Sequence, residues 1–156
     1  MNFRLLITAY FIIIPAVLFC QTESGINKID PAGRKQGRWI KKYPDNTIKY
    51  EGFFRDNNPE GEFKRYYEDG TIKSVLNYSN NGNETEAKIY HSNGYLSAKG
   101  RYINQKKEGP WQFYSEFING YLVIEETYSG NIRNGISVKI YPDGKIAEKL
   151  NFVNDT

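Results

Sequence analysis

The chain of 156 residues contains two similar sequence segments, one near each end. The first copy, at residues 43–54, reads YPDNTIKYEGFF, and the second, at residues 141–152, reads YPDGKIAEKLNF. Five units align on the turn residue of this segment, which is Asn46, Gly70, Gly94, Gly120 and Gly144, at intervals of 24, 24, 26 and 24 residues. In every unit an aliphatic residue follows the turn residue by two positions and an aromatic residue follows it by eight. Self-similarity at a fixed short period is typical of repeat proteins, so we predict five tandem units of about 24 residues.

Each unit has the pattern of a β-hairpin. Asp-Gly and Asn-Gly pairs at the turns tolerate the positive φ that tight hairpin turns require. Aromatic residues make up 15% of the chain, and Tyr and Phe suit half-buried strands. In the second unit Ile72, Ser74, Leu76 and Tyr78 share one strand face, because their spacing is even. The predicted fold is therefore all-β, with five tandem hairpins paired into one elongated, twisted antiparallel sheet.

A glycine stands nine residues before the turn residue in several units, for example at Gly37 and Gly61. Glycine adopts backbone conformations that other residues avoid. We therefore predict that this leading glycine marks the tight link from the preceding unit. The fourth unit has the longest turn and an apolar run over residues 121–124, where contact with a partner and a bulged turn are both consistent with the sequence.

The first twenty residues differ from the rest. Arg4 precedes an apolar run over residues 5–19, which is shorter than the roughly 20 residues of a spanning helix and typical of a signal peptide. We predict a signal helix over residues 1–20, a linker over 21–32 and a repeat domain over 33–156. Cleavage after Cys20 would release the chain, whereas lipidation of Cys20, the only cysteine, would anchor it to the envelope. The bulky Phe19 disfavours lipidation, and an uncleaved amphipathic start is the third alternative. The expected location is periplasmic or extracellular, or lipid-anchored to the envelope.

Charge gives no indication of nucleic-acid binding. Removing residues 1–20 removes Arg4 and leaves 20 basic and 18 acidic residues. The basic stretch RKQGRWIKK at residues 34–42 has acidic residues close by in the sequence, whereas nucleic-acid binders show stronger and more one-sided charge. The sequence therefore predicts no nucleic-acid partner.

Residues suited to catalysis are sparse. His91, the only histidine, stands where the first two units have Tyr43 and Tyr67, so it is interpreted as a substitute in an aromatic position. One histidine and no cysteine in residues 21–156 cannot supply a histidine- or thiolate-rich metal site. Adjacent residues of a strand point to opposite faces, so Glu125 and Glu126 cannot act together on one bond. We expect a protein that is not an enzyme and holds no metal or cofactor.

Residues 50–73, YEGFFRDNNPEGEFKRYYEDGTIK, resemble MORN repeats, whose pattern is Tyr-x-Gly-x-aromatic, a loop, Gly-x-aromatic and then Asp-Gly. The positions of this pattern are filled by Tyr50, Gly52, Phe54, Gly61, Phe63, Asp69 and Gly70. Residues 98–111 contain it again, with Gly100, Tyr102, Gly109 and Trp111. The fuller unit is similar to the bacterial variant repeat of the YwqK-type antitoxin family, over about residues 33–153. The third unit departs from the pattern with Thr85 and Ala87, and the fifth with Ser137.

The resemblance implies an array of β-hairpins that attaches to a protein or a membrane. The expected function is an exported, non-enzymatic scaffold that binds a protein or cell-envelope component through an aromatic-rich sheet face. Two alternatives are an envelope-located antitoxin that neutralises a partner toxin and a glycan hydrolase that uses scattered carboxylates. The candidate binding residues are aromatic, and ordinary strand packing is the competing explanation for each: Trp39, Tyr43, Phe63, Tyr67, Trp111 and Tyr114.

Overall fold

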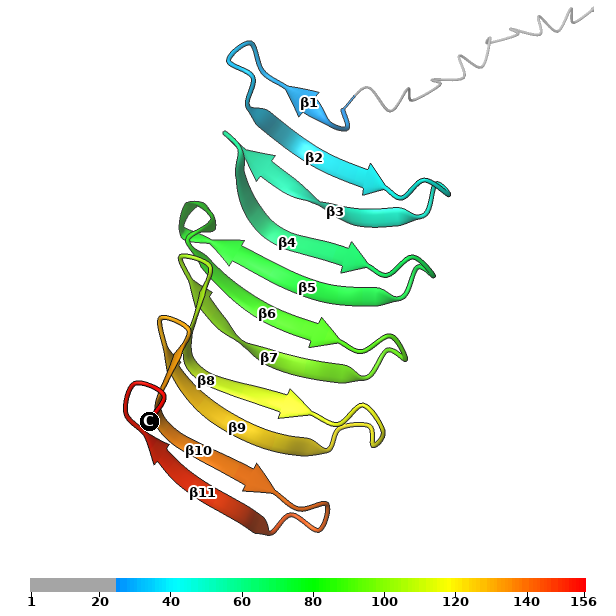
Figure 1. Ribbon diagram of the computed structural model, residues 1–156. Coiled ribbons are helices and arrows are strands. Elements are labelled where there is room, and N and C mark those ends of the chain that lie inside the picture. The colour runs from blue at the N-terminus through cyan, green and yellow to red at the C-terminus, as the bar shows by residue number, and fades with distance from the viewer. Residues whose placement is uncertain (1–24) are drawn as a thin grey trace, which may run out of the picture.

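The computed structural model describes residues 25–156 as one antiparallel sheet of eleven strands that pair in chain order (Figure 1). The strands are β1 (Lys28–Ile29), β2 (Lys35–Lys42), β3 (Ile48–Arg55), β4 (Asn58–Tyr66), β5 (Ile72–Ser79), β6 (Glu84–Tyr90), β7 (Leu96–Ile103), β8 (Lys106–Tyr114), β9 (Leu122–Ser129), β10 (Ile132–Ile140) and β11 (Ile146–Phe152). A short 3₁₀ turn, η1 (Asn80–Gly82), follows β5. The prediction of an all-β antiparallel sheet is confirmed. The predicted signal helix and Cys20 lie outside the described residues.

Four of the five hairpin turns share one backbone pattern, and the longer β8–β9 turn differs from it. Between β2 and β3 the Asn46 amide donates to the Tyr43 carbonyl at 3.1 Å, and the Tyr43 amide donates to the Thr47 carbonyl at 2.8 Å. The β4–β5, β6–β7 and β10–β11 turns repeat these two bonds. Asn46 has a φ of 71° and Gly70 a φ of 85°, so the predicted turn residues do adopt positive φ. These turns lie together along one side of the sheet (Figure 1).

The links between hairpins lie along the opposite side of the sheet (Figure 1). The link between β5 and β6 covers residues 80–83 and contains η1, whereas the other three links consist of two residues with positive φ. They are Asp56–Asn57 between β3 and β4, Asn104–Gln105 between β7 and β8, and Gly130–Asn131 between β9 and β10. Such turns match the right-handed twist of the strands that they join. The prediction that the leading glycine marks this link is wrong, because Gly61 lies inside β4.

The leading glycine instead forms a β-bulge that brings a large ring over a second glycine. Between β3 and β4 the pairing passes from Glu51–Lys64 to Phe53–Glu60, so that the three residues 61–63 lie opposite Gly52. The bulge lets the Phe63 ring lie on Gly52, where an added Cβ would come within 2.0 Å of Phe63 Cδ2. The same bulge between β7 and β8 places Trp111 over Gly100, with a corresponding distance of 2.3 Å to Trp111 Cδ2. One large ring thus accounts for both glycines of the sequence pattern. The leading glycine forms the bulge that positions the ring, and the glycine on the neighbouring strand leaves room for it.

The two units that depart from the glycine and aromatic pattern, the third and the fifth, differ in whether they form the bulge. The β5–β6 pair has an unbroken register, in which Leu76 lies opposite Ala87 and Tyr78 opposite Thr85. Without a leading glycine and a large ring, this pair forms no bulge. Between β9 and β10 the register still shifts between Arg133 and Ser137. The bulge at Gly135 therefore persists although Ser137 supplies no ring.

The most deeply buried side chains lie around Trp111 of β8. Trp111 is fully buried, at 0% exposure, and forms a buried cluster with Ala87 and Ala98. Partly buried side chains pack against this cluster: Leu76, Ile89, Tyr102, Phe113 and Tyr128. Because a single sheet has no second layer, these side chains must cover one another.

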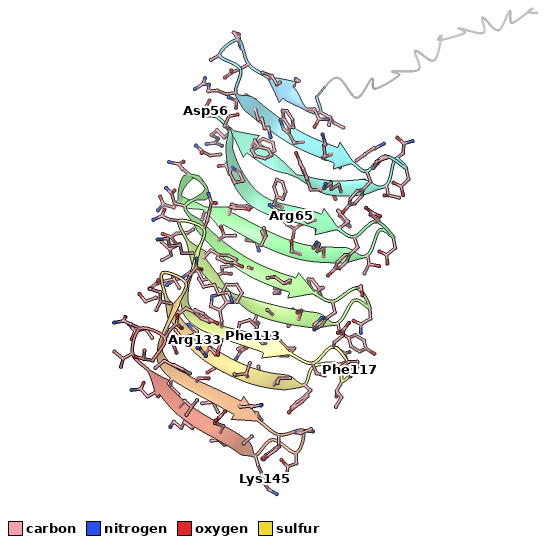
Figure 2. All side chains as sticks on the ribbon, in the orientation of Figure 1. Asp56, Arg65, Phe113, Phe117, Arg133 and Lys145 are labelled. Atoms are coloured by element: carbon pink, nitrogen blue, oxygen red, sulfur yellow. The ribbon has the colours of Figure 1, made fainter. Side chains whose placement is uncertain are left out.

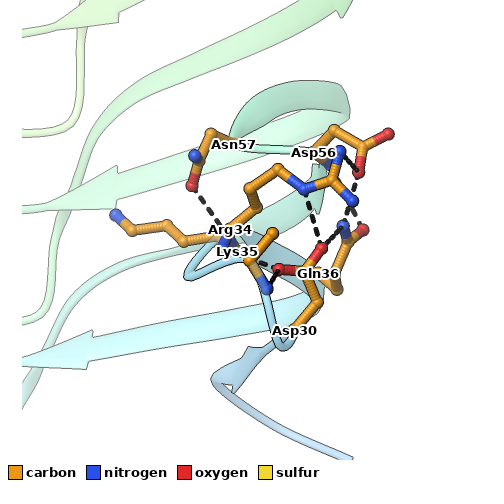
Figure 3. A network of polar contacts seen from close by, with 7 residues as sticks. Asp30, Arg34, Lys35, Gln36, Asp56 and Asn57 are labelled. Atoms are coloured by element: carbon orange, nitrogen blue, oxygen red, sulfur yellow. Dashed lines mark hydrogen bonds and ion pairs between the residues drawn. The ribbon is translucent and has the colours of Figure 1, made fainter.

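Polar contacts close the N-terminal edge of the sheet (Figure 3). Asp30 accepts hydrogen bonds from the backbone amides of Ala32 and Arg34 and from the side chains of Arg34 and Gln36, at 2.8–3.1 Å. Arg34 also pairs with Asp56 of the next link at 3.0 Å. Strand β1 lies within the predicted linker, residues 21–32, and pairs with β2. The contacts thus tie this segment to the first hairpin.

We predict that Gly100→Ala destabilises the protein by about 1–3 kcal/mol, the usual cost of overpacking a core. The added methyl group overlaps Trp111, whose ring is enclosed on all sides. Chemical denaturation followed by tryptophan fluorescence measures the change. Gly25→Ala is the control, because nothing lies within 4 Å of its Cβ position. Equal stabilities of the two variants would contradict the role assigned to Gly100.

We also predict a low pKa for Asp30. The backbone hydrogen bond from Arg34, followed by the side-chain hydrogen bonds of Gln36 and Arg34, lowers the pKa of Asp30 from 3.8 to about 2. A lowered carboxyl pKa contributes stability that is present above pH 3.8 and lost as the pH falls through about 2. The Arg34 amide resonance in NMR should titrate with a midpoint near 2 and should stop titrating in Asp30→Asn. A midpoint at or above 3.8 would be inconsistent with the network.

Candidate functional site

One face of the sheet carries ten of the 20 Tyr, Phe and Trp rings of residues 25–156, and we call it the aromatic face. Its rings are those of Trp39, Tyr50, Phe54, Phe63, Tyr78, Tyr102, Trp111, Phe113, Tyr128 and Phe152. The rings form chains of edge and tilted contacts, such as Phe54–Phe63 at 5.6 Å and Tyr102–Trp111 at 4.8 Å between centroids. Figure 2 shows Phe113 and Arg65 of this face near the middle of the sheet, between the turn and link sides. The face runs over all five hairpins.

Basic side chains cover the rings near the two ends of the aromatic face. Lys35 Nζ lies 4.8 Å from the Trp39 ring and 4.9 Å from the Phe54 ring. Lys107 Nζ lies within 4.9 Å of three rings, those of Trp111, Phe113 and Tyr128, and its burial there lowers the pKa of Lys107. The Arg133 guanidinium lies 4.1 Å from Phe152. Cations over ring faces are attracted by the ring quadrupole, and their stems cover apolar surface.

A hollow of about 710 Å³ interrupts the aromatic face between Phe63 and Trp111, and we call it the central hollow. The cations Lys35, Lys107 and Arg133 each stand two residues before a leading glycine, and Pro59 and Asn83 hold the matching positions of the β4–β5 and β6–β7 hairpins. No basic side chain therefore lies over the rings of Tyr78 and Tyr102 from this position. The floor is formed by small and aliphatic side chains: Ser74, Leu76, Thr85 and Ile89.

The charge of the central hollow is positive. Arg65 and Lys73 line it, and no aspartate or glutamate does. Both side chains are exposed, and neither takes part in an ion pair within residues 25–156. A hollow on the opposite face is lined by four glutamates as well as by Lys88, Lys99 and Arg101. The two faces thus present different electrostatic surfaces.

The six candidate binding residues do not form one surface. Phe63 and Trp111 are 5% and 0% exposed, so they build the core and offer almost no area to a partner. Trp39 is half-buried beneath Lys35. Tyr114 follows Trp111 by three residues and faces the other side of the sheet, where its hydroxyl donates to Gln112 Oε1 at 2.8 Å. A binding role for these residues stays a prediction.

The remaining two candidates, Tyr43 and Tyr67, connect neighbouring hairpins. The Tyr43 hydroxyl donates to the Tyr66 carbonyl at 2.9 Å, and the Tyr67 hydroxyl donates to the Tyr90 carbonyl at 2.8 Å. His91 Nε2 lies 3.3 Å from the Tyr114 carbonyl, so His91 occupies the aromatic position that the sequence predicted. The Tyr121 hydroxyl donates to the Ile140 carbonyl and continues the series. Each of the first four hairpins is therefore tied to the next at its turn.

Glu125 and Glu126 lie on opposite faces, as their adjacency predicted. Glu125 accepts a hydrogen bond from the Gln112 side chain at 2.6 Å on the face opposite the aromatic face. Glu126 accepts from the Tyr128 hydroxyl on the aromatic face and lies 3.7 Å from Arg133. Burial, followed by the bond to Glu126, raises the pKa of Tyr128. Within residues 25–156, no three His, Cys, Asp or Glu side chains are grouped so that they could hold a metal ion.

The turn of the fourth hairpin, for which partner contact was one expectation, exposes two apolar side chains. Phe117 is 89% exposed and Ile118 is 50% exposed. The apolar run over residues 121–124 itself is half-buried, and most of it belongs to β9.

Among residues 25–156, no helix has the length and apolar character needed to cross a membrane.

Comparison with protein families gives two matches, to residues 59–80 and to residues 133–154. Both segments match the MORN repeat variant. Each match spans one hairpin with its turn, β4–β5 or β10–β11, and begins two residues before the leading glycine. A search of curated proteins found no match to the chain. Each match to the MORN repeat variant thus covers a hairpin whose first strand has a bulge at its leading glycine where it pairs with the preceding strand.

Sequence reasoning missed the basic residues that distinguish the ends of the aromatic face from its centre. The signal was present in the spacing, since Lys35, Lys107 and Arg133 all precede a leading glycine by two residues. The assignment of Ile72, Ser74, Leu76 and Tyr78 to one strand face implied that Lys73, which lies between Ile72 and Ser74, points to the other face. The register shift between Arg65 and Tyr66 lets it line the central hollow instead.

We predict that Tyr67→Phe destabilises the protein by about 0.5–1.5 kcal/mol, the net value of one intramolecular hydrogen bond. The change removes only the hydroxyl that donates to the Tyr90 carbonyl. Tyr141→Phe is the matched control, because Tyr141 begins the last turn and its hydroxyl has no hydrogen-bond partner in the described part of the chain. Urea denaturation of both variants measures the difference. A Tyr141→Phe variant as destabilised as Tyr67→Phe would show that the bond between hairpins contributes nothing.

Proposed function

We propose that the protein is an exported, non-enzymatic scaffold of five tandem units of about 24 residues, which binds a protein or cell-envelope component through its aromatic face. The observation that carries this proposal is the central hollow, where rings lie without a covering cation between two ends that are covered. Concave sites lined by apolar and aromatic side chains with a few polar groups are typical of binding sites. The hollow is therefore the place on this face best suited to a ligand.

Export is proposed from the sequence of residues 1–20. A basic residue followed by an apolar run of this length is typical of a signal peptide. Cleavage would free the repeat domain, and lipidation of Cys20 would hold it at the envelope. Mass spectrometry of the mature N-terminus distinguishes these two forms.

An envelope-located antitoxin is the second candidate function. The matches to the MORN repeat variant favour it, because the antitoxin family that the sequence resembles is built from a variant of this repeat. In this case the aromatic face would cover the surface of a toxin rather than bind an envelope component. Coexpression with a neighbouring toxin gene would then restore growth, and an unaltered growth defect would reject this alternative.

Charge reversal on the aromatic face tests the main proposal. Arg65→Glu combined with Lys73→Glu changes two exposed residues of the central hollow, and we expect this variant to lose the envelope component that the unchanged protein retains in pull-downs. The reason is that the binding surface would change from positive to negative. Mass spectrometry of the retained material identifies the component.

The matched control combines Lys88→Glu and Lys99→Glu, which are exposed and line the hollow of the opposite face. This variant carries the same change in net charge and should retain the component. Equal retention by the two double variants, or recovery of chaperones alone, would contradict binding through the aromatic face.

A further inference from the structure

The central hollow has a second feature that narrows the chemistry of its ligand. Side-chain amides at three successive links surround it: Asn57 of the first link with the adjoining Asn58 of β4, Asn81 and Asn83 of the link between β5 and β6, and Gln105 of the link between β7 and β8. Asn58, Asn81, Asn83 and Gln105 make no side-chain hydrogen bond within residues 25–156, so their donors and acceptors are free for a ligand. An amide group both donates and accepts, which matches the paired hydroxyl groups of a saccharide.

The two cations lie at the other end of the hollow. Arg65 stands near the turn end of β4, and Lys73 follows the turn at the start of β5. The Arg65 guanidinium lies 6.0 Å from the Phe63 ring and Lys73 Nζ lies 5.1 Å from the Tyr67 ring, and neither cation forms an ion pair within residues 25–156. A guanidinium and an ammonium without an acidic partner favour a carboxylate, since hydrogen bonds between ionised groups are the strong ones. The absence of any acidic side chain from the lining leaves this charge uncompensated among the described residues. The ligand should therefore be an anion.

The dimensions require a ligand longer than a single small anion. Arg65 and Asn58 are seven residues apart on β4, which is about 23 Å at roughly 3.3 Å per residue and less across the bulge. A volume of about 710 Å³ is within the usual range for sites that bind small molecules. Tyr78 and Tyr102 line the hollow between these ends and offer ring surface to an apolar ligand face.

We infer that the central hollow binds an acidic oligosaccharide, with a carboxylate of the ligand at Arg65 and Lys73 and its hydroxyl groups on the amides of the links. This inference rests on the proposed function and names a class of envelope component for the same face. An extended acidic peptide fits less well. Bound peptides commonly pair with main-chain groups of a sheet edge, whereas the hollow lies on the face of strands that are paired on both sides.

Titration of the full chain with an oligomer of four galacturonic acid residues tests the inference. Isothermal titration calorimetry should detect binding of this tetramer and no binding of the neutral galactose tetramer or of tetraglutamate. Arg65→Gln and Lys73→Gln should each weaken binding about tenfold, the effect of losing one charge-assisted hydrogen bond. Lys149→Gln, an exposed residue on β11 that does not line the hollow, should bind as the unchanged protein does.

Several outcomes would overturn the inference. Equal binding of the neutral tetramer would remove the role of charge, and equal or tighter binding of tetraglutamate would make the ligand a peptide. Unaltered binding by Arg65→Gln and Lys73→Gln would place the saccharide elsewhere, and no binding of the acidic tetramer would end the inference. In that last case the pull-down with charge-reversed variants still decides whether the aromatic face binds another component, so the two proposals fail separately.

Discussion

The structure depends on large rings that lie across glycine residues of the neighbouring strand. A sheet of one layer has no facing helix or sheet, so its apolar side chains must cover each other. Phe63 on Gly52 and Trp111 on Gly100 achieve this, because a glycine leaves room for a ring directly against the backbone. The bulge at the leading glycine supplies the extra residues that bring the ring over that position. Trp111 is completely buried as a result, although it belongs to a single sheet.

The same arrangement determines where the aromatic face is closed and where it is open. Rings at both ends are covered by a lysine or arginine that precedes the leading glycine, whereas Pro59 and Asn83 leave the centre uncovered. The buried hydroxyl side chains Ser74 and Thr85 lie in the floor of the central hollow, and Ala87 stands where other hairpins have Phe63 or Trp111. Different residues thus serve stability and the proposed binding. The buried rings stabilise the sheet, whereas exposed cations and amides surround the hollow.

The hairpins and their turn residues followed from the sequence because they rest on local backbone preferences. Asn46 and Gly70 have the positive φ that the turns require, and His91 occupies the position of a tyrosine. The role of the leading glycine did not follow, because a bulge is a relation between two strands, and no single strand contains the signal. For the same reason Phe63 and Trp111 were candidates for a surface although they are buried. The central hollow depends on which side chains are missing from a face, and even spacing placed Lys73 on the wrong side of a bulged strand.

Native-state hydrogen exchange along the sheet tests the central claim most directly. If ring-on-glycine packing around Trp111 stabilises the structure, amide protection should be greatest in β7 and β8 and should decrease toward β2 and β11. Exposed amides of the turns and links should exchange first. Protection that is uniform along the sheet, or greatest in β11, would contradict the claim that this packing holds the sheet together.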